Sequence, residues 1–463
     1  MNTEPLSDHQ KITNNKNIKI KILKYFLLLV LFFTLFFTGI FLMDIYAISF
    51  DSKFGNIDNY YIKIPATVIP ENPLRKEASD FVKPRKDFTG KADELNKIIG
   101  NIDKCLDKKF DFDEHTKTRL WKNYSGLLQN LDLLSTKPPM AEEKPAIKIP
   151  ELFFTGNLKI FNISTFILRV KMSAFLALIA IEKKDYPMAL CIDAALMRLS
   201  RAVAVANFNQ PGLLGVIFQY ETARLAAKGP ARVYLECNEA LREHQNMVLV
   251  KAALKSRVES LPLFYNVRDA LKLEAALIHA RFSVIRSKFS TTMKILDLWY
   301  EKPEAFFNGL IKAIDEVPDE QGAKLTKTAK EYFRRYTEFG EPGLKRFLKI
   351  HPLFYQTGFP DFTKLITNSV KSDAHNRLTT LCGLARVYYY ENGSWPALEQ
   401  NGEFLAAAGK AAIDPADAGL MRSKRMPGGL FCYYSIGPDG IDNDGNENED
   451  VVIFIKPPAT KLK

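Results

Sequence analysis

Six acidic residues gather near the end of the chain, in the segment GPDGIDNDGNENEDVV. They lie inside twelve positions and are Asp439, Asp442, Asp444, Glu447, Glu449 and Asp450. Carboxylates at this density repel one another, and a hard cation that takes oxygen ligands relieves the repulsion. Ca²⁺ takes about 6 to 8 oxygens from Asp, Asn and backbone carbonyls, and this glycine-containing segment supplies all three. The segment is therefore a candidate calcium loop.

The acidic segment matches an EF-hand only in part. With Gly445 at the sharp-turn position, Asp442 and Asp444 fall on ligand positions 3 and 5. Gly440 and Val451 would then stand at positions 1 and 12, where an EF-hand has acids. We therefore do not expect an EF-hand. A solvated hairpin loop is the alternative interpretation, because turns favour the same Asp, Asn and Gly residues.

No other residue cluster has the spacing of a known catalytic chemistry. The six histidines form no HExxH motif and no i, i+4 pair, and they are His9, His115, His244, His279, His351 and His375. The sequence also has no GxSxG, P-loop or GxGxxG motif and indicates no small-molecule substrate. These patterns favour a protein that is not an enzyme, although a dispersed site stays open as an alternative.

The acidic segment lies between two runs that have strand character. LFCYYSIG precedes it and VVIFI follows it, and both are short and rich in aromatic or β-branched residues. A helix is expected over 373–391, ahead of both runs. Residues 371–463 are therefore predicted to form a small α+β module.

This C-terminal module resembles the major pseudopilins of bacterial type II secretion and related pilin-like proteins. Those proteins end in a YSxGxDG-type loop and a strand, and this chain has YYSIGPDGIDNDG followed by DVVIFI. Its ARVYYYENGSWPALEQ is similar to their ARxYYxxNGxYPTxEQ element, with Asn392, Gly393, Trp395, Pro396 and Gln400 on the motif. The resemblance implies a structural calcium ion, whose ligands in this chain would be Asp439, Asp442, Asp444 and Asp450.

Two features separate the chain from a pilin. A pilin has a prepilin peptidase site after a Gly, before a Phe-Thr-Leu-Ile-Glu-like start, and this chain lacks it. A pilin span also continues directly into the helix before the calcium region, whereas here the apolar run lies far upstream of 373–391. The whole layout resembles a group of bacterial single-pass membrane-anchored helical proteins, and that likeness implies no activity.

A run of nineteen uncharged residues, 25–43, reads YFLLLVLFFTLFFTGIFLM. At 1.5 Å per residue such a helix spans roughly 28 Å, about the thickness of a hydrocarbon core. Five lysines precede it in 1–24 and Asp44 follows it, which predicts a cytoplasmic tail and an extracytoplasmic bulk. A cleaved signal peptide is the alternative, but the run is long for one and only Ala47 offers a weak cleavage site. The expected location is the bacterial inner membrane.

The remaining organisation is predicted to be mainly helical. Residues 44–90 have the composition of a linker or stalk, and 91–150 that of a helical hairpin. Residues 151–370 indicate a helical bundle or short α-solenoid, in which LIAIEKKDYPMALCIDAALMRLSRAV faintly resembles a tetratricopeptide helix pair. The five cysteines form no CxxC motif and are expected as small buried residues rather than disulfides.

The net charge is +11, and the basic excess lies outside the acidic segment. A domain outside the membrane has little access to nucleic acid, so an anionic leaflet or cell-wall polymer suits this excess better. The sequence favours a membrane-anchored extracytoplasmic scaffold or interaction protein of the bacterial envelope, with a protein or envelope partner and a calcium-stabilised loop. An anchored envelope hydrolase and a pilin-like, secretion-associated assembly component are the alternatives.

Overall fold

The computed structural model describes a little under three fifths of the chain. The described residues are 24–28, 30–36, 38–39, 61–62, 92–126, 128, 147–148, 163–203, 213–261, 267, 303–318, 320–337, 362–396, 398, 401–427 and 430–456. They form twelve α-helices outside 24–39, a two-stranded and a three-stranded antiparallel sheet, and one 3₁₀ turn. The prediction of a mainly helical protein with a small C-terminal sheet is confirmed.

The predicted membrane helix, 25–43, falls only partly on described residues. Residues 24–28, 30–36 and 38–39 are helical, and the rest of the run lies outside the described part. None of the helices described by the structure is both long and apolar enough to cross a membrane. The span stays a prediction. The predicted linker, 44–90, lies outside the described residues except for β1 (Tyr61–Ile62), which pairs with β2 (Ile147–Lys148).

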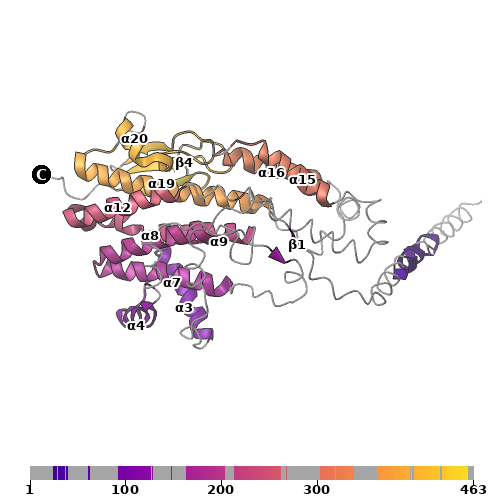
Figure 1. Ribbon diagram of the computed structural model, residues 1–463, viewed down its shortest axis with the longest axis horizontal. Coiled ribbons are helices and arrows are strands. Elements are labelled where there is room, and N and C mark those ends of the chain that lie inside the picture. Colours follow the sequence, from indigo (N-terminus) through magenta and orange to yellow (C-terminus); the bar gives the residue numbers. More distant parts are fainter. Residues whose placement is uncertain are drawn as a thin grey trace, which may run out of the picture.

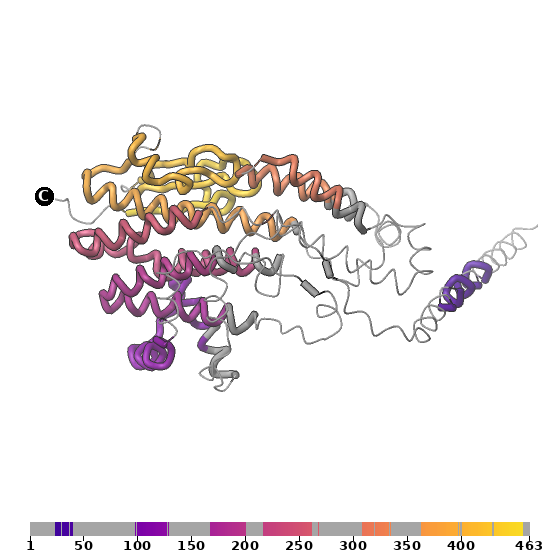
Figure 2. The backbone as a smooth tube through the Cα atoms, in the orientation of Figure 1, coloured from indigo at the N-terminus to yellow at the C-terminus, as the bar shows by residue number. Residues whose placement is uncertain are grey.

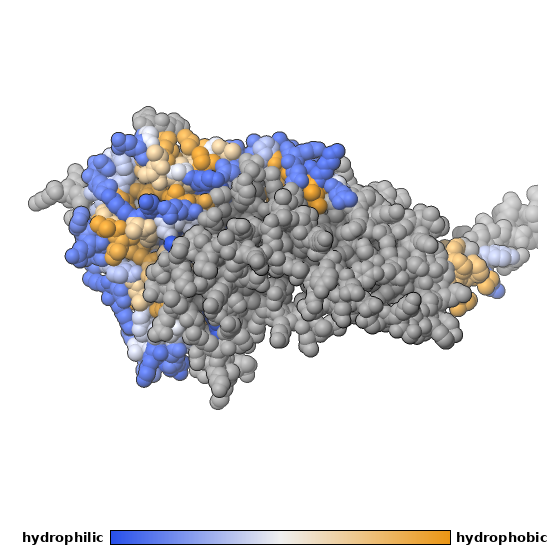
Figure 3. Space-filling model, in the orientation of Figure 1, coloured by the Kyte–Doolittle hydropathy of each residue, from blue (hydrophilic) through white to orange (hydrophobic). Residues whose placement is uncertain are grey.

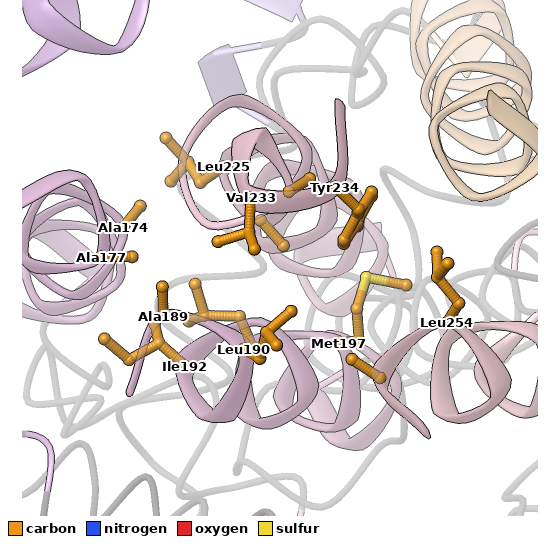
Figure 4. Packing of buried hydrophobic residues seen from close by; sticks show 14 of the residues in the cluster. Ala174, Ala177, Ala189, Leu190, Ile192, Met197, Leu225, Val233, Tyr234 and Leu254 are labelled. Carbon is orange, nitrogen blue, oxygen red and sulfur yellow. The ribbon is translucent and has the colours of Figure 1, made fainter. Parts of the chain in front are cut away.

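The core of the helical body is built from α7 (Ile163–Glu182), α8 (Tyr186–Val203) and α9 (Leu213–Lys228), which pack on one another. The turn between α7 and α8 falls where KKDYP predicts a break, and the Asp185 carboxylate accepts from the Met188 N–H at 3.2 Å. Small side chains such as Ala174, Ala177 and Ala189 line the crossing (Figure 4). The apolar segment 173–181 therefore lies in the core, apart from its last residue.

A close backbone approach explains one glycine in this core. A Cβ on Gly229, directly after α9, would lie 2.7 Å from the carbonyl oxygen of Ala174. No larger residue fits there without moving α7 away from α9.

Shorter helices surround this core. The helices α3 (Ala92–Leu106) and α4 (Glu114–Tyr124) occupy the predicted hairpin region, and both pack against α7. On the other side, α10 (Arg232–Glu236), α11 (Asn238–Arg242) and α12 (His244–Ser260) lead from α9 toward the C-terminal part. In Figures 1 and 2 the helices form successive layers, from α3 and α4 through α7 to α8, α9 and α12.

The longest helix, α19 (Phe362–Asn392), lies between the helical body and the C-terminal sheet. It packs against α9 and α12 on one side and against β4 (Phe431–Ser435) and β5 (Val451–Ile455) on the other. It begins before the expected 373 and ends at the predicted NGSWP break, where Gly393 adopts a φ of +71°. One helix is therefore shared by the predicted helical domain and the predicted C-terminal module.

The sheet has the order β3-β4-β5, and β3 (Arg422–Arg425) is a strand that the sequence pattern did not reveal. Its four residues are all polar because it forms an edge of the sheet, whereas the central β4 is fully buried. The segment after α19 packs on β4: Trp395 stacks on Phe431 with ring centroids 5.7 Å apart, and the Tyr433 hydroxyl donates to the Pro396 carbonyl.

Two further helices lie beside this module. The pair α15 (Pro303–Asp315) and α16 (Gly322–Thr337) packs together, and α16 also packs on α19. The module is completed by α20 (Gly402–Ala408) and a 3₁₀ turn, η4 (Gly409–Ala412), which contact α19.

A fully buried ion pair joins α8 to α12. Arg257 donates from Nη1 to Asp193 at 2.5 Å, and neither side chain is exposed to solvent. The same guanidinium donates to Asn376 at 3.1 Å and to Thr380 at 3.3 Å, both on α19. The Tyr234 hydroxyl of α10 donates to the second Asp193 oxygen at 3.2 Å, and burial raises the pKa of this phenol well above its usual value. Four helices therefore meet at one carboxylate–guanidinium pair.

Asp193→Ala tests this network. The substitution leaves Arg257 buried without its counter-charge, and we expect the free energy of unfolding to fall by about 3–5 kcal/mol. Urea denaturation of the detergent-solubilised full chain, followed by circular dichroism, measures the change. Lys255→Ala, at an exposed position of α12, is the matched control and should change stability by less than about 0.5 kcal/mol. A loss below about 1 kcal/mol for Asp193→Ala would contradict the structural role given to the pair.

Candidate functional site

The candidate calcium loop connects β4 to β5, as the sequence predicts. Ser435 pairs with Val451 at its base, so the two strands hold residues 436–450 as a closed loop. Three glycines that the loop needs, Gly437, Gly440 and Gly445, have φ between 70° and 74°. Asp444 also adopts the left-handed conformation, with φ of 57°.

Carboxylates of the loop accept hydrogen bonds from the loop's own backbone N–H groups. The Asp442 carboxylate accepts from the Asp444 N–H at 3.0 Å, and that of Asp439 accepts from the Ile441 N–H at 3.3 Å. These are the side-chain to backbone bonds of Asx turns, which the alternative interpretation of a solvated turn also expects. Asp439, Asp442 and Asp444 are exposed, and all three stay accessible to an ion.

Asp450 differs from the other three predicted ligands because it is 94% buried, with a relative exposure of 6%. Its Oδ2 accepts from the Gly445 N–H at 2.8 Å, so the carboxylate faces the inside of the loop. Its Oδ1 is buried and has no hydrogen-bond partner among the described residues. A buried carboxylate oxygen without a partner is costly, and a bound cation would satisfy it.

Two basic side chains on β3 approach the acidic loop, and the sequence analysis missed both. Arg422 and Lys424 alternate along the strand and therefore share one face. Lys424 forms an ion pair with Asp444, and the Arg422 Nε lies 3.7 Å from an Asp442 oxygen. The alternation of basic residues in RSKR, just upstream of the loop, was the available signal. The protein's own cations thus relieve part of the repulsion that motivated the calcium prediction.

Arg422 also fixes the loop to the turn before β3. It donates to Asp414 at 2.7 Å and to Asp417 at 2.5 Å. Asp414 is fully buried and further accepts from the Ser435 hydroxyl at 2.6 Å and the Ile436 N–H at 3.1 Å. Burial raises the pKa of Asp414, and these bonds offset part of that effect. Partial burial disfavours the Asp417 carboxylate too, but the hydrogen bond from Arg422 leaves its pKa lowered overall.

The acidic loop lies against the first turn of α16. A Cβ on Gly440 would approach the Ala323 Cβ to 2.9 Å, which is closer than such atoms pack. The Gly322 and Ala323 N–H groups donate to the carbonyls of Pro415 and Ala416 at 2.8 and 2.9 Å. Negative charge is favoured at a helix N-terminus, so this position suits an acidic loop.

The structure brings the four predicted ligands into one loop, but each has another partner. Within the described residues, no group of three or more His, Cys, Asp or Glu side chains is arranged to hold a metal ion. A calcium ion would have to displace Lys424 from Asp444, and the calcium site stays a prediction. The oxygen donors fit Ca²⁺, and the partnerless Asp450 oxygen is the observation that favours it.

Other reactive residue types are dispersed over the described part of the chain. His115, His244 and His375 lie on α4, α12 and α19, and the other three histidines fall outside the described residues. All five cysteines are free thiols, of which Cys105, Cys382 and Cys432 are buried as expected. Burial raises the pKa of Cys105 to about 11, which leaves this thiol protonated and unreactive at neutral pH.

Comparisons with models of protein families, with curated protein sequences and with solved structures find no match to this chain. Its function has to be argued from its own residues.

Arg422→Gln tests how the loop is held. Removing the guanidinium leaves Asp414 buried without its cation and Asp442 without a neighbouring positive charge. We expect a loss of about 1–3 kcal/mol of stability and faster protease cleavage within 436–450. Arg425→Gln on the exposed side of the same strand removes the same charge and should leave both properties unchanged. Equal effects of the two substitutions would show that Arg422 does not hold the loop.

Proposed function

We propose that this protein is a membrane-anchored extracytoplasmic scaffold or interaction protein. One observation carries the anchor: the described large apolar side chains of 25–36 are between 45% and 72% exposed, and they include five Phe or Tyr rings. They are Tyr25, Phe26, Leu27, Leu28, Val30, Leu31, Phe32, Phe33, Leu35 and Phe36. A continuous apolar surface of this kind is stable in lipid and unfavourable in water.

The proposed orientation rests on the charges beside this helix. Five lysines in 1–24 precede the apolar run, and positively charged flanks remain in the cytoplasm. The helical body and the acidic loop would then lie on the outer side of a bacterial inner membrane. Millimolar calcium is common outside cells, and extracellular calcium modules bind at about 10⁻⁴ to 10⁻³ M.

The helical body supports an interaction role. Its α7–α8 pair has a tight turn and an Ala-lined crossing, features shared with the helix pairs of α-solenoids. The buried arginines Arg257, Arg377 and Arg386 each bond to neighbouring helices or turns, so their role is to join elements. These features favour a rigid frame that presents its surface to a protein or envelope partner.

The C-terminal module supports the calcium part of the proposal. A long helix packed on an antiparallel sheet, with an acidic loop between its last two strands, is the layout that the pseudopilin resemblance implies. If calcium binds, Asp439, Asp442, Asp444 and Asp450 would supply oxygen ligands, and the ion would neutralise the loop and satisfy the buried Asp450 oxygen. A pilin-like assembly role is the second candidate, because the same layout favours it.

The anchor predicts resistance to alkaline extraction. Wild-type chain should remain in the membrane pellet after carbonate washing. Leu35→Arg should release a large fraction, because an arginine near the helix centre costs about 2.5–3.5 kcal/mol of insertion. Leu35→Ile is the control and should stay in the pellet. A reporter fused after Lys463 should be active only outside the cytoplasm, and cytoplasmic activity would contradict the orientation.

The calcium loop predicts a response to calcium and to chelator. At a calcium concentration a hundredfold above Kd, the folded state should gain about 2.7 kcal/mol, measured as a rise in melting temperature of the full chain in detergent. Chelator should expose 436–450 to protease. Asp442→Ala combined with Asp444→Ala should abolish both responses, whereas Lys424→Ala should strengthen calcium binding because it frees Asp444.

A matched control separates ligand loss from charge loss. Glu447→Ala combined with Glu449→Ala removes the same charge from the same loop and should leave the calcium response in place. No calcium heat in titration of the wild-type chain, up to several times about 10⁻³ M, would leave the solvated-turn interpretation.

A further inference from the structure

The outward face of α16 carries a row of basic residues. Lys324, Lys327, Lys330 and Arg334 follow one another at intervals of three and four, which places them on one side of the helix. All four side chains are exposed. The opposite side buries Leu325, Thr326 and Ala329, each at most 1% exposed. This side packs against α19, so the basic row faces away from the protein.

Among the described residues, the three lysines of this row have no ion-pair partner. Many other lysines of the described part have a carboxylate partner, such as Lys117, Lys171, Lys228 and Lys251. Within that part, no carboxylate lies within 4.0 Å of the Nζ of Lys324, Lys327 or Lys330. The sequence of α16 has five basic residues and one acid, a net charge of +4. Figure 3 shows a hydrophilic outer surface over α15 and α16.

We propose that the basic face of α16, formed by Lys324, Lys327, Lys330 and Arg334, binds anionic phospholipid headgroups of the membrane that carries the chain. This inference rests on the proposed membrane anchor and names a second contact with the same bilayer. The row covers the eleven residues from Lys324 to Arg334 and extends about 15 Å along the helix. Each lysine close to an anionic leaflet raises partitioning roughly fivefold.

Charge complementarity favours a lipid surface over a protein partner. The row combines separated positive charges with no large apolar residue between them, whereas tight protein interfaces use buried aromatic or aliphatic anchors. One weak attachment gives only reversible membrane binding, and a second attachment makes the binding stable. The anchor also keeps the concentration of this face near the leaflet high, so weak contacts suffice.

Nearby acids limit which part of α16 approaches the leaflet. The acidic loop lies at the first turn, where Gly440 contacts Ala323, and α15 ends shortly before this turn at Asp315, directly followed by Glu316. The later turns, from Lys327 to Arg334, have only Glu331 as an acid on the helix. The contact should therefore be made mainly by the C-terminal half of the row.

Lysine acetylation of the full chain, reconstituted in vesicles, tests the inference. Mass spectrometry compares phosphatidylcholine vesicles with vesicles that contain about 30% phosphatidylglycerol, at low salt and with chelator to exclude calcium bridges. Acetylation of Lys327 and Lys330 should be about fivefold slower in the anionic vesicles, and about 0.5 M salt should restore the rate. The exposed Lys104, Lys122 and Lys255, on three other helices, should react equally in both.

Variants provide the second measurement. Energy transfer from a C-terminal dye to headgroup-labelled lipid should fall to the phosphatidylcholine value in the Lys324→Gln, Lys327→Gln, Lys330→Gln triple variant. The triple variant at Lys104, Lys122 and Lys255 has the same charge change and should keep the anionic-lipid signal. Equal acetylation of the α16 lysines in both lipids overturns the inference. Protection from acetylation that depends on the number of chains per vesicle, and not on phosphatidylglycerol, also overturns the inference. That result would indicate contact between copies of the chain. Loss of the chain on alkaline washing would instead count against the anchor itself.

Discussion

The structure depends on arginines that are buried among helices and bonded to side chains or backbone carbonyls of neighbouring elements. Arg257 joins α8, α12 and α19 through Asp193, Asn376 and Thr380. A buried guanidinium is costly unless its charge is paired and hydrogen-bonded, so a shift of any of these helices that breaks the bonds of Arg257 is unfavourable. The network therefore fixes one arrangement of the body, and α19 carries that arrangement to the rest of the molecule.

Two further buried arginines lie on α19. One holds elements of the helical body to this helix, and the other holds elements of the C-terminal module to it. Arg386 donates to the Tyr234 carbonyl at 2.9 Å and to Asn238, which holds α10 and α11. Arg377 donates to the carbonyls of Lys410 and Ile413, which holds η4 and the turn before β3. The turn carries Asp414, and Asp414 in turn holds Arg422 and the start of the acidic loop. The loop is thus positioned from the core outward.

This connection links the acidic loop to the basic face of α16. The acidic loop lies at the first turn of α16, and the basic face of α16 begins on that turn. The acidic loop places negative charge at the N-terminal end of α16, and the basic residues place positive charge along the rest of the helix. A cation bound in the loop would reduce the negative charge at the N-terminal end of α16. The proposed leaflet contact uses the positive charge of the later turns.

The amino-acid sequence alone determined the helical class, the break at KKDYP, and strands β4 and β5 around the acidic loop. These features follow from local periodicity and turn chemistry, which depend on neighbouring residues. Strand β3 and the partners of the acids were decided by tertiary structure. RSKR becomes a strand only because β4 offers it a ladder, and Arg422 meets Asp442 across twenty residues of sequence. The network around Arg257 spans more than a hundred residues, and no local pattern marks an arginine whose partners arrive only on folding.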